Sequence, residues 1–273
     1  MNHYIWHFWV SAVHLCVPLL LFLSPALLPA QGMIEGNAVL TSHSGTISVR
    51  GDSGQNRPVE PRTGFSPTGT QWSTPNNAQA FLAFSNGTAL GIGKSTRLDI
   101  VNYQQEPFSP EKEGFSYEPS TSKLTLELES GQLALVCQRL SPVSELRIRL
   151  PHGSLRIHRG IVHIRYDQTG LHIAMVEGNS TYYYPDNDAR EFVTGGSIVR
   201  IGVQSVQRQQ IAERLPVDTL TPDAVQLYQA TTHASRRVLF RANAGTNAPP
   251  APRMVVRPDY YQQPSPRPYE FKD

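Results

Sequence analysis

The stretch that most resembles a site for chemistry is GTALGIGKS, from Gly87 to Ser95. It ends like a phosphate-binding P-loop, which requires the pattern G-x-x-x-x-G-K-[ST]. The first glycine of that pattern would stand at position 88, where this sequence has Thr88. A P-loop also opens a helix, whereas Leu98 and Ile100 alternate with polar residues, which is the period of a strand. The stretch therefore predicts a turn at Gly87 and closely packed strands, not a nucleotide site.

Histidines are the candidates for a metal site. His163 and His172 flank a predicted hairpin turn at residues 167–170 and would lie diagonally on one face of its two strands. A zinc site needs three or four protein ligands, and neither a cysteine nor a carboxylate is expected to complete the set. Arg165 lies between the two histidines and would repel a cation. A solvated polar face is favoured, and we expect no metal and no other cofactor.

Patterns typical of covalent or acid–base catalysis are missing from the sequence. There is no G-x-S-x-G motif and no cysteine–histidine arrangement. Glu127 and Glu129 alternate along one strand, as exposed residues of a half-buried strand do. Cys137 ends an apolar stretch, so we expect a buried side chain and not a reactive thiol. We therefore expect that the protein is not an enzyme.

Tyrosines form a second group of candidate contacts, at Tyr182, Tyr183 and Tyr184 and again at Tyr260 and Tyr261. Exposed rings could form a platform for a sugar or for peptidoglycan. Successive side chains of a strand point to opposite faces, however, so a run of tyrosines more often divides between core and surface. Both interpretations stay open at this stage.

The composition restricts the class of protein. The 273 residues include 24 Lys and Arg against 22 Asp and Glu, and the net charge of +2 predicts no nucleic-acid partner. The 22 prolines and 20 glycines favour short strands and many turns over long helices.

An apolar run covers residues 10–30, near the N-terminus. Three prolines interrupt it, which favours a cleaved signal peptide, with cleavage expected after Ala30 or, less favourably, after Ala26. Residues 1–8 contain no Lys or Arg, and the run is long enough to span a bilayer, so an uncleaved anchor is the alternative. We assign residues 1–30 to a signal peptide or N-terminal anchor. The chain is expected to contact a membrane only through this segment, if it is not cleaved.

Alternating apolar segments fill residues 39–202. At Gly87, Gly131 and Gly178, a polar residue and a glycine separate two such segments, which predicts equivalent corners between strands. The hairpin around residues 167–170 would direct one set of side chains to the core and His163, Arg165, His172 and Ala174 to the opposite face. The pattern predicts an all-β fold, a compact domain of short, mostly antiparallel strands arranged as a sandwich or roll.

Beyond residue 202 the pattern changes. Residues 204–215 are expected to be helical, and Thr221, Pro222 and Asp223 predict the start of a helix that continues to about Arg241. We assign residues 203–243 to a short helical segment and residues 244–273 to a disordered Pro-rich tail. The tail is either a spacer or an extended arm that docks on a partner.

Taken together, the segments resemble the FecR-like periplasmic domain family over about residues 39–202. The resemblance is carried by the segments 44–49, 74–88, 124–136, 150–153 and 159–178 and by Gly195-Gly196. It implies protein interaction and envelope signalling, not chemistry. Signal-relaying members carry a cytoplasmic anti-sigma segment before a membrane helix, whereas here the apolar run begins within ten residues of Met1. Only the extracytoplasmic module is therefore expected.

The sequence thus predicts an exported, non-catalytic module in the periplasm or on the bacterial envelope, with an envelope protein as its partner. The alternative is a carbohydrate- or peptidoglycan-binding module that uses its tyrosines. The residues expected to contact a ligand or partner are Tyr182, Tyr183, Tyr184, His163 and His172.

Overall fold

The computed structural model describes residues 32–107, 117–185, 189–202, 213–236, 238–242 and 252–256. The expected signal peptide or anchor lies outside these ranges, as do Tyr260, Tyr261 and most of the Pro-rich tail. The fold described below is that of the unit Gly32–Asp273. Within the described residues, none of the helices has both the length and the apolar character needed to cross a membrane.

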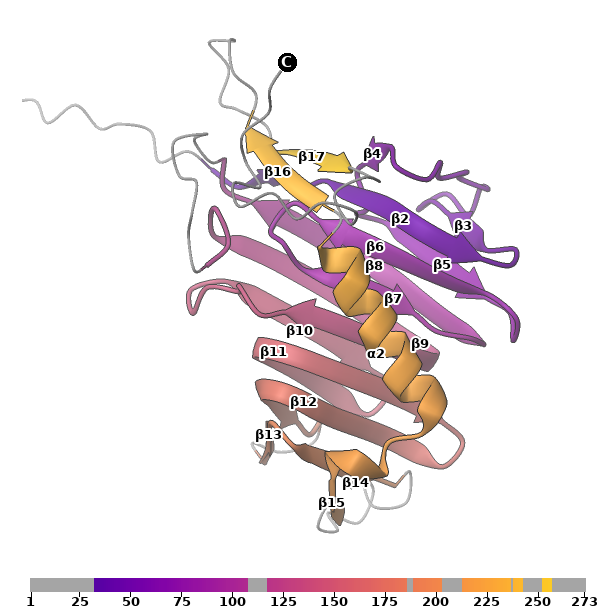
Figure 1. Ribbon diagram of the computed structural model, residues 1–273, viewed down its shortest axis with the longest axis vertical. Coiled ribbons are helices and arrows are strands. Elements are labelled where there is room, and N and C mark those ends of the chain that lie inside the picture. Colours follow the sequence, from indigo (N-terminus) through magenta and orange to yellow (C-terminus); the bar gives the residue numbers. More distant parts are fainter. Residues whose placement is uncertain are drawn as a thin grey trace, which may run out of the picture. The chain divides into compact units, whose positions relative to one another are not determined.

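Strands dominate the described residues, as the predicted all-β class requires (Figure 1). Fifteen of them join in one sheet, in which only the pair β9–β10 is parallel among the described pairings. Their bounds are β1 Ile34–Glu35, β2 Ala38–Ser44, β3 Ser48–Arg50, β4 Gly64–Phe65, β5 Thr70–Thr74, β6 Gln79–Phe84, β7 Ala89–Ile92, β8 Thr96–Gln105, β9 Ser122–Cys137, β10 Glu145–Leu150, β11 Gly153–Asp167, β12 Gly170–Tyr183, β13 Arg190–Thr194, β14 Ser197–Ile201 and β15 Glu213–Pro216.

Three strands are much longer than the short strands expected. β9, β11 and β12 contain 16, 15 and 14 residues. Each changes partners along its length: β9 pairs first with β8 and β10 and then with β7 and β11, while β11 and β12 change partners near Gly160 and Gly178. The predicted corners are therefore not equivalent: Gly87 makes a tight turn between two strands, whereas Gly131 and Gly178 make bends within one continuous strand.

Glycine is required at these bends because the backbone adopts positive φ, which side chains with a Cβ disfavour. The φ angles are 96° at Gly131, 129° at Gly160 and 87° at Gly178. Gly160 and Gly178 lie directly opposite each other in the β11–β12 ladder, and a Cβ on either one would collide with a backbone carbonyl of the other strand.

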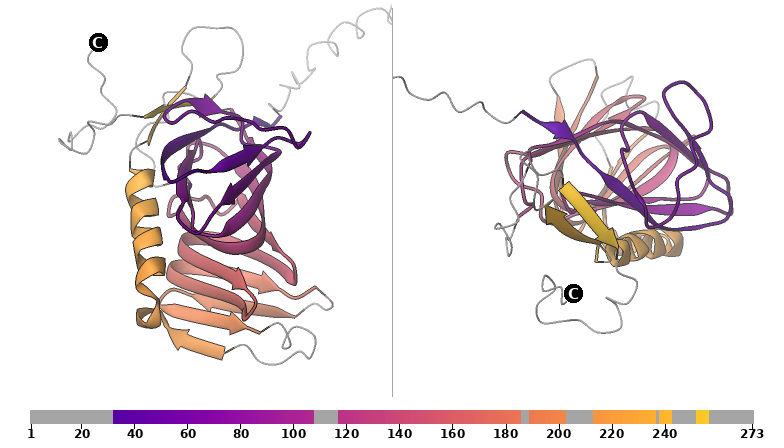
Figure 2. Two further views of the ribbon diagram at one scale, coloured as in Figure 1. Left: turned by 90° about the vertical axis from the view of Figure 1, so that its right-hand side faces the viewer. Right: turned by 90° about the horizontal axis from the view of Figure 1, so that it is seen from above.

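One hydrophobic core receives side chains from both halves of the long strands. Its largest fully buried side chains are Trp72, Tyr103 and Tyr182. On the β11–β12 hairpin, Val162, Ile164, Leu171, Ile173 and Met175 all enter this core, as the period-two pattern predicts. The sheet therefore bends around a single core, in agreement with the predicted sandwich or roll (Figure 2).

The helix α2, Pro222–Ser235, lies against the outer side of β6, β7 and β9 (Figure 1). Its start agrees with the prediction, since the side chain of Thr221 accepts a hydrogen bond from the backbone N–H of Ala224 at 3.4 Å. Leu227 and Ala234 pack on Phe81 and Ala134 in a second, smaller apolar cluster. The helix is thus fixed to the sheet by its own apolar side.

Two predicted helical stretches are strands instead. Residues 213–216 form β15, which pairs with β14, while residues 204–212 of the same predicted helix lie outside the described part. A 3-10 turn, Val217–Thr219, separates β15 from α2. Helix α2 ends at Ser235, short of Arg241, because residues 238–242 form β16 and pair with β17, Pro252–Val256, within the Pro-rich tail.

Candidate functional site: a polar cleft beside the start of helix α2

A cleft of about 1000 Å³ lies where four loops of the sheet approach the N-terminal end of α2. The loops are the β5–β6 turn, the β7–β8 turn, the bend of β9 at Gly131 and the β11–β12 turn. Apart from Gly131, each lining residue carries a polar or charged group; the lining consists of Asn76, Lys94, Ser95, Ser130, Gly131, Gln132, Arg165, Tyr166, Asp167, Gln168, Thr169 and Asp223.

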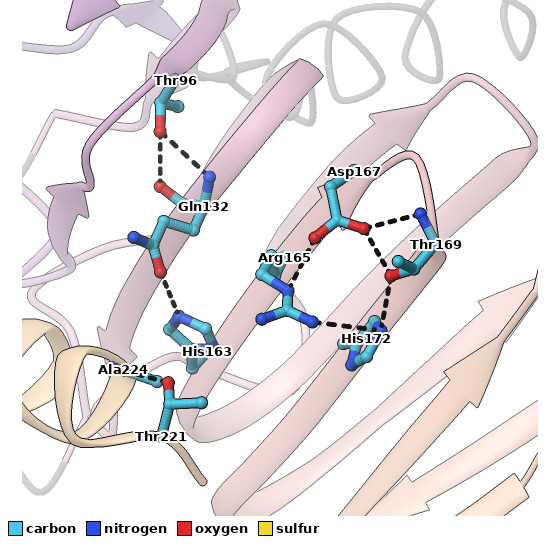
Figure 3. A network of polar contacts seen from close by, with 9 residues as sticks. All are labelled: Thr96, Gln132, His163, Arg165, Asp167, Thr169, His172, Thr221 and Ala224. Atoms are coloured by element: carbon cyan, nitrogen blue, oxygen red, sulfur yellow. Dashed lines mark hydrogen bonds and ion pairs between the residues drawn. The ribbon is translucent and has the colours of Figure 1, made fainter. Parts of the chain in front are cut away.

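One hydrogen-bond chain holds the bend of β9 in place (Figure 3). The hydroxyl oxygen of Thr96 accepts a hydrogen bond from the backbone N–H of Gln132 at 3.0 Å. The same hydroxyl can donate to the backbone carbonyl of Gln132, which lies 3.1 Å away. The side-chain oxygen of Gln132 then lies 3.2 Å from Nε2 of His163. Because an amide oxygen only accepts, Nε2 of His163 carries the proton and donates.

Neutral His163 is the form that this environment favours. The side chain is only 3% exposed. Burial, followed by the positive charges of Arg165 and His172, lowers the pKa of His163 to about 4. The imidazole is therefore uncharged near neutral pH and orients Gln132 at the wall of the cleft.

A second network fixes the β11–β12 turn (Figure 3). Arg165 Nε lies 3.0 Å from a carboxylate oxygen of Asp167, and the other oxygen accepts from the backbone N–H of Thr169 at 2.8 Å. Partial burial raises the pKa of Asp167, but the hydrogen bonds from Thr169 and the charge of Arg165 outweigh this and lower it overall. The carboxylate thus stays ionised and holds the turn in one shape.

His172 belongs to this second network. Its Nε2 lies 3.3 Å from the hydroxyl of Thr169 and 3.4 Å from a guanidinium nitrogen of Arg165. Burial and the charges of Arg165 and Arg200 lower the pKa of His172. The two histidines lie diagonally on one face, as predicted, since His163 is opposite Ala174 and His172 is opposite Arg165.

The expected solvated polar face is only partly correct. Arg165 and His172 are half-buried, but His163 is buried, because this side of the sheet is where the N-terminal end of α2 approaches (Figure 3). Within the described ranges, no three His, Cys, Asp or Glu side chains are grouped so that they could hold a metal ion.

The three consecutive tyrosines do not form a common platform. Tyr182 is fully buried in the core, and its hydroxyl donates to the carbonyl of His152. Tyr184 packs edge-on against Tyr182, with ring centroids 5.0 Å apart. Tyr183 points to the opposite side of the sheet, where the guanidinium of Arg190 lies 5.4 Å from its ring centre. Because successive side chains of a strand point to opposite faces of the sheet, Tyr182 lies in the core while Tyr183 lies on the other face. Tyr182 therefore offers no surface to a ligand.

The stretch that resembles a P-loop contributes to the cleft through its end. Strand β8 follows it, as the alternating pattern predicts. Lys94 forms an ion pair of 3.7 Å with Asp223 in the first turn of α2, and Ser95 has a φ of 51°, which turns the chain sharply into β8. Cys137 is buried as expected, and burial raises the pKa of its thiol to about 12.

Sequence reasoning identified His163 and His172 but not the cleft itself. Asn76, Lys94, Gln132 and Asp223 are far apart in the chain and come together only in the fold. The local signals that mark them are turn residues, since Lys94 and Gln132 each directly follow a glycine.

Comparison with known proteins leaves the family open. No family model matches the sequence, and no curated protein matches it. Two crystal structures of a candidate anti-sigma factor from Parabacteroides distasonis, at 2.50 and 1.65 Å resolution, are similar to the chain with a TM-score of 0.40 each. Their sequence identities are 11% and 10%, and the similarity covers 63% of this chain and 67% of each of theirs.

Proposed function

We propose that this chain is an exported, non-catalytic, FecR-like module that binds a protein partner and takes part in signal sensing in the bacterial cell envelope. The observation that carries the proposal is the polar cleft. Its volume of about 1000 Å³ lies at the upper end of the range for small-molecule sites, which is roughly 300–1000 Å³. A peptide segment of a partner protein fits a cleft of this size.

The charges of the cleft match a peptide that carries both signs. Lys94 pairs with Asp223 and Arg165 pairs with Asp167, and all four side chains are 36% or more exposed. Exposed pairs of this kind contribute only about 0–1 kcal/mol. A partner with its own carboxylate and ammonium groups can therefore replace them at little cost and gain specificity from four charges held at set positions.

Two buried side chains outside the lining of the cleft argue for binding and against catalysis. His163, the buried imidazole of the site, donates to an amide oxygen and not to a nucleophile. Cys137 is buried and its pKa is raised, so it carries no thiolate near neutral pH. Export rests on the apolar N-terminal run, and the FecR-like assignment rests on the order of strands and glycines over residues 39–202.

Site-specific photocrosslinking in intact cells tests the proposal. A photoreactive residue replaces Gln168, which is exposed at the rim of the cleft, or Val143, which is 73% exposed on the β9–β10 loop and serves as the control. We expect one dominant crosslinked protein from position 168 and none from position 143. Crosslinks that are equal at both positions, or absent from position 168, would contradict a partner site in the cleft.

Arg165→Gln provides a second measurement. It removes the pair with Asp167 and should reduce the yield of the crosslink from position 168 several-fold. N-terminal sequencing of the purified chain completes the experiment, since export with cleavage predicts a start near Gln31.

A further inference from the structure

A cluster of arginines lies on the outer side of strands β10 to β13. We call it the arginine face and define it by Arg147, Arg149, Arg156 and Arg190 with the rings of Tyr183 and Phe192. On these strands the alternating partners Leu146, Ile148, Leu155, Tyr182 and Val193 enter the core. Side chains alternate between the two faces of a sheet, so the six residues of the arginine face point away from the core.

The strand register places these six residues in two adjacent rows. In the first row Arg147 is opposite Arg156, and Arg156 and Phe192 are both opposite Thr181. In the second row Arg149 and Tyr183 are both opposite Ser154, and Tyr183 is opposite Arg190. Neighbouring positions are about 5 Å apart across the strands and about 7 Å apart along them. The face is therefore a regular array in which four arginines lie among two aromatic rings and the small side chains of Ser154 and Thr181.

The positive charge of the array is only partly compensated. Arg147 pairs with Glu145 at 2.9 Å, and Arg149 lies 3.8 Å from Glu127. Arg156 forms no ion pair with any carboxylate of the described residues. Like charges directly opposite each other on a sheet are destabilising, and Arg147 and Arg156 are such a pair. An anion bound between the two guanidinium groups would relieve this repulsion.

The aromatic residues distinguish one kind of anion from another. Phe192 is 61% exposed at the end of the first row and offers a free ring. Tyr183 does not, because Arg190 already covers its ring. Single-stranded nucleic acids bind to sheets through several rings that stack on successive bases. One free ring beside a row of guanidinium groups fits a chain of sugar rings with acidic substituents better.

We propose that the arginine face binds an anionic polysaccharide, which lies across strands β10 to β13. Guanidinium groups bind carboxylate, sulfate or phosphate oxygens with paired hydrogen bonds. Phe192 packs against the apolar face of one sugar ring. This surface is separate from the cleft, whose lining includes none of the six residues.

Binding of fluorescent polygalacturonate to the purified full-length chain tests this proposal, with dextran as the neutral polymer and oligothymidylate as the nucleic acid. We expect binding to polygalacturonate that weakens as salt is raised, and no binding to dextran. Arg156→Gln should weaken binding about tenfold and reduce the slope of log affinity against log salt by roughly one. The matched control is Arg97→Gln, an exposed arginine of β8 that is paired with Glu129 at 3.0 Å, and it should leave the affinity within about twofold.

Circular dichroism verifies that both variants are folded, which we expect since neither side chain enters the core. Three results would overturn the proposal: no binding to polygalacturonate, equal binding to dextran, or tighter binding to oligothymidylate. If Arg156→Gln and Arg97→Gln have the same effect, the polymer does not bind at the arginine face.

Discussion

Gly91 lies in β7 directly beneath helix α2. A Cβ at this position would lie 2.1 Å from the hydroxyl oxygen of Thr231, and 3.3 Å from side-chain carbons of Leu227 and Phe81. Thr231 is fully buried, and its hydroxyl donates to the carbonyl of Leu227 at 2.7 Å, so it has little freedom to move aside. Gly91→Ala must therefore displace either the threonine or the helix.

Overpacking of this kind costs about 1–3 kcal/mol. For a domain of this size we expect the melting temperature to fall by roughly 2–12 °C. Urea unfolding followed by circular dichroism measures the free energy, and a thermal melt measures the temperature. The matched control is Gly64→Ala in β4, where a Cβ would meet no atom within 4 Å, and it should change the stability by less than about 0.5 kcal/mol.

The double variant Gly91→Ala/Thr231→Ala separates this collision from a general intolerance of alanine in β7. Without the hydroxyl, the new methyl group has room, so the double variant should be at least about 1 kcal/mol more stable than Gly91→Ala alone. Our reasoning is refuted if Gly91→Ala is as stable as the wild type, or if Thr231→Ala brings no recovery.

Three further predictions concern buried groups. His163 has a folded-state pKa of about 4, below its unfolded value of about 6.5, so its contribution of about 3 kcal/mol to the free energy of unfolding is complete above pH 6.5 and is lost as the pH falls toward 4. The free energies of unfolding of the wild type and of His163→Gln should therefore converge as the pH falls through this window. Parallel curves of the free energy of unfolding against pH would contradict the lowered pKa. Cys137, studied in a Cys16→Ser background, should resist a thiol reagent in the folded chain and react at once in urea. Tyr182→Ala should cost about 3–5 kcal/mol while Tyr183→Ala costs less than about 1 kcal/mol, and equal losses in urea unfolding would contradict the burial of Tyr182 alone in the core.

Local patterns predicted much of the fold. The register of the β11–β12 hairpin follows from its alternation and from the turn at residues 167–170, because a slip of one residue would expose every core side chain. The start of α2 follows from Thr221 and Pro222, since a cap and a missing N–H act within one turn of the chain.

Boundaries and bends were less predictable. Residues 213–216 have a helical pattern but form a strand, because the edge of β14 offers hydrogen-bond partners that the sequence does not show. The glycines at 87 and 131 look alike in sequence, yet one makes a tight turn and the other a bend within β9. A tight turn forms where the segment after the glycine pairs with the segment before it, as β7 pairs with β6. A bend forms where the two segments pair with different strands, as the two halves of β9 do.

The sequence by itself determined the strand class, the faces of the hairpin and the position of the helix cap, all of which depend on interactions between near neighbours. Only the tertiary structure decided that Lys94 meets Asp223, that Gln132 meets His163 and that the arginines of three strands form one face. Each of these contacts joins residues that are separate in the chain. They form because the shared core fixes which strands are neighbours, and no local pattern contains that information.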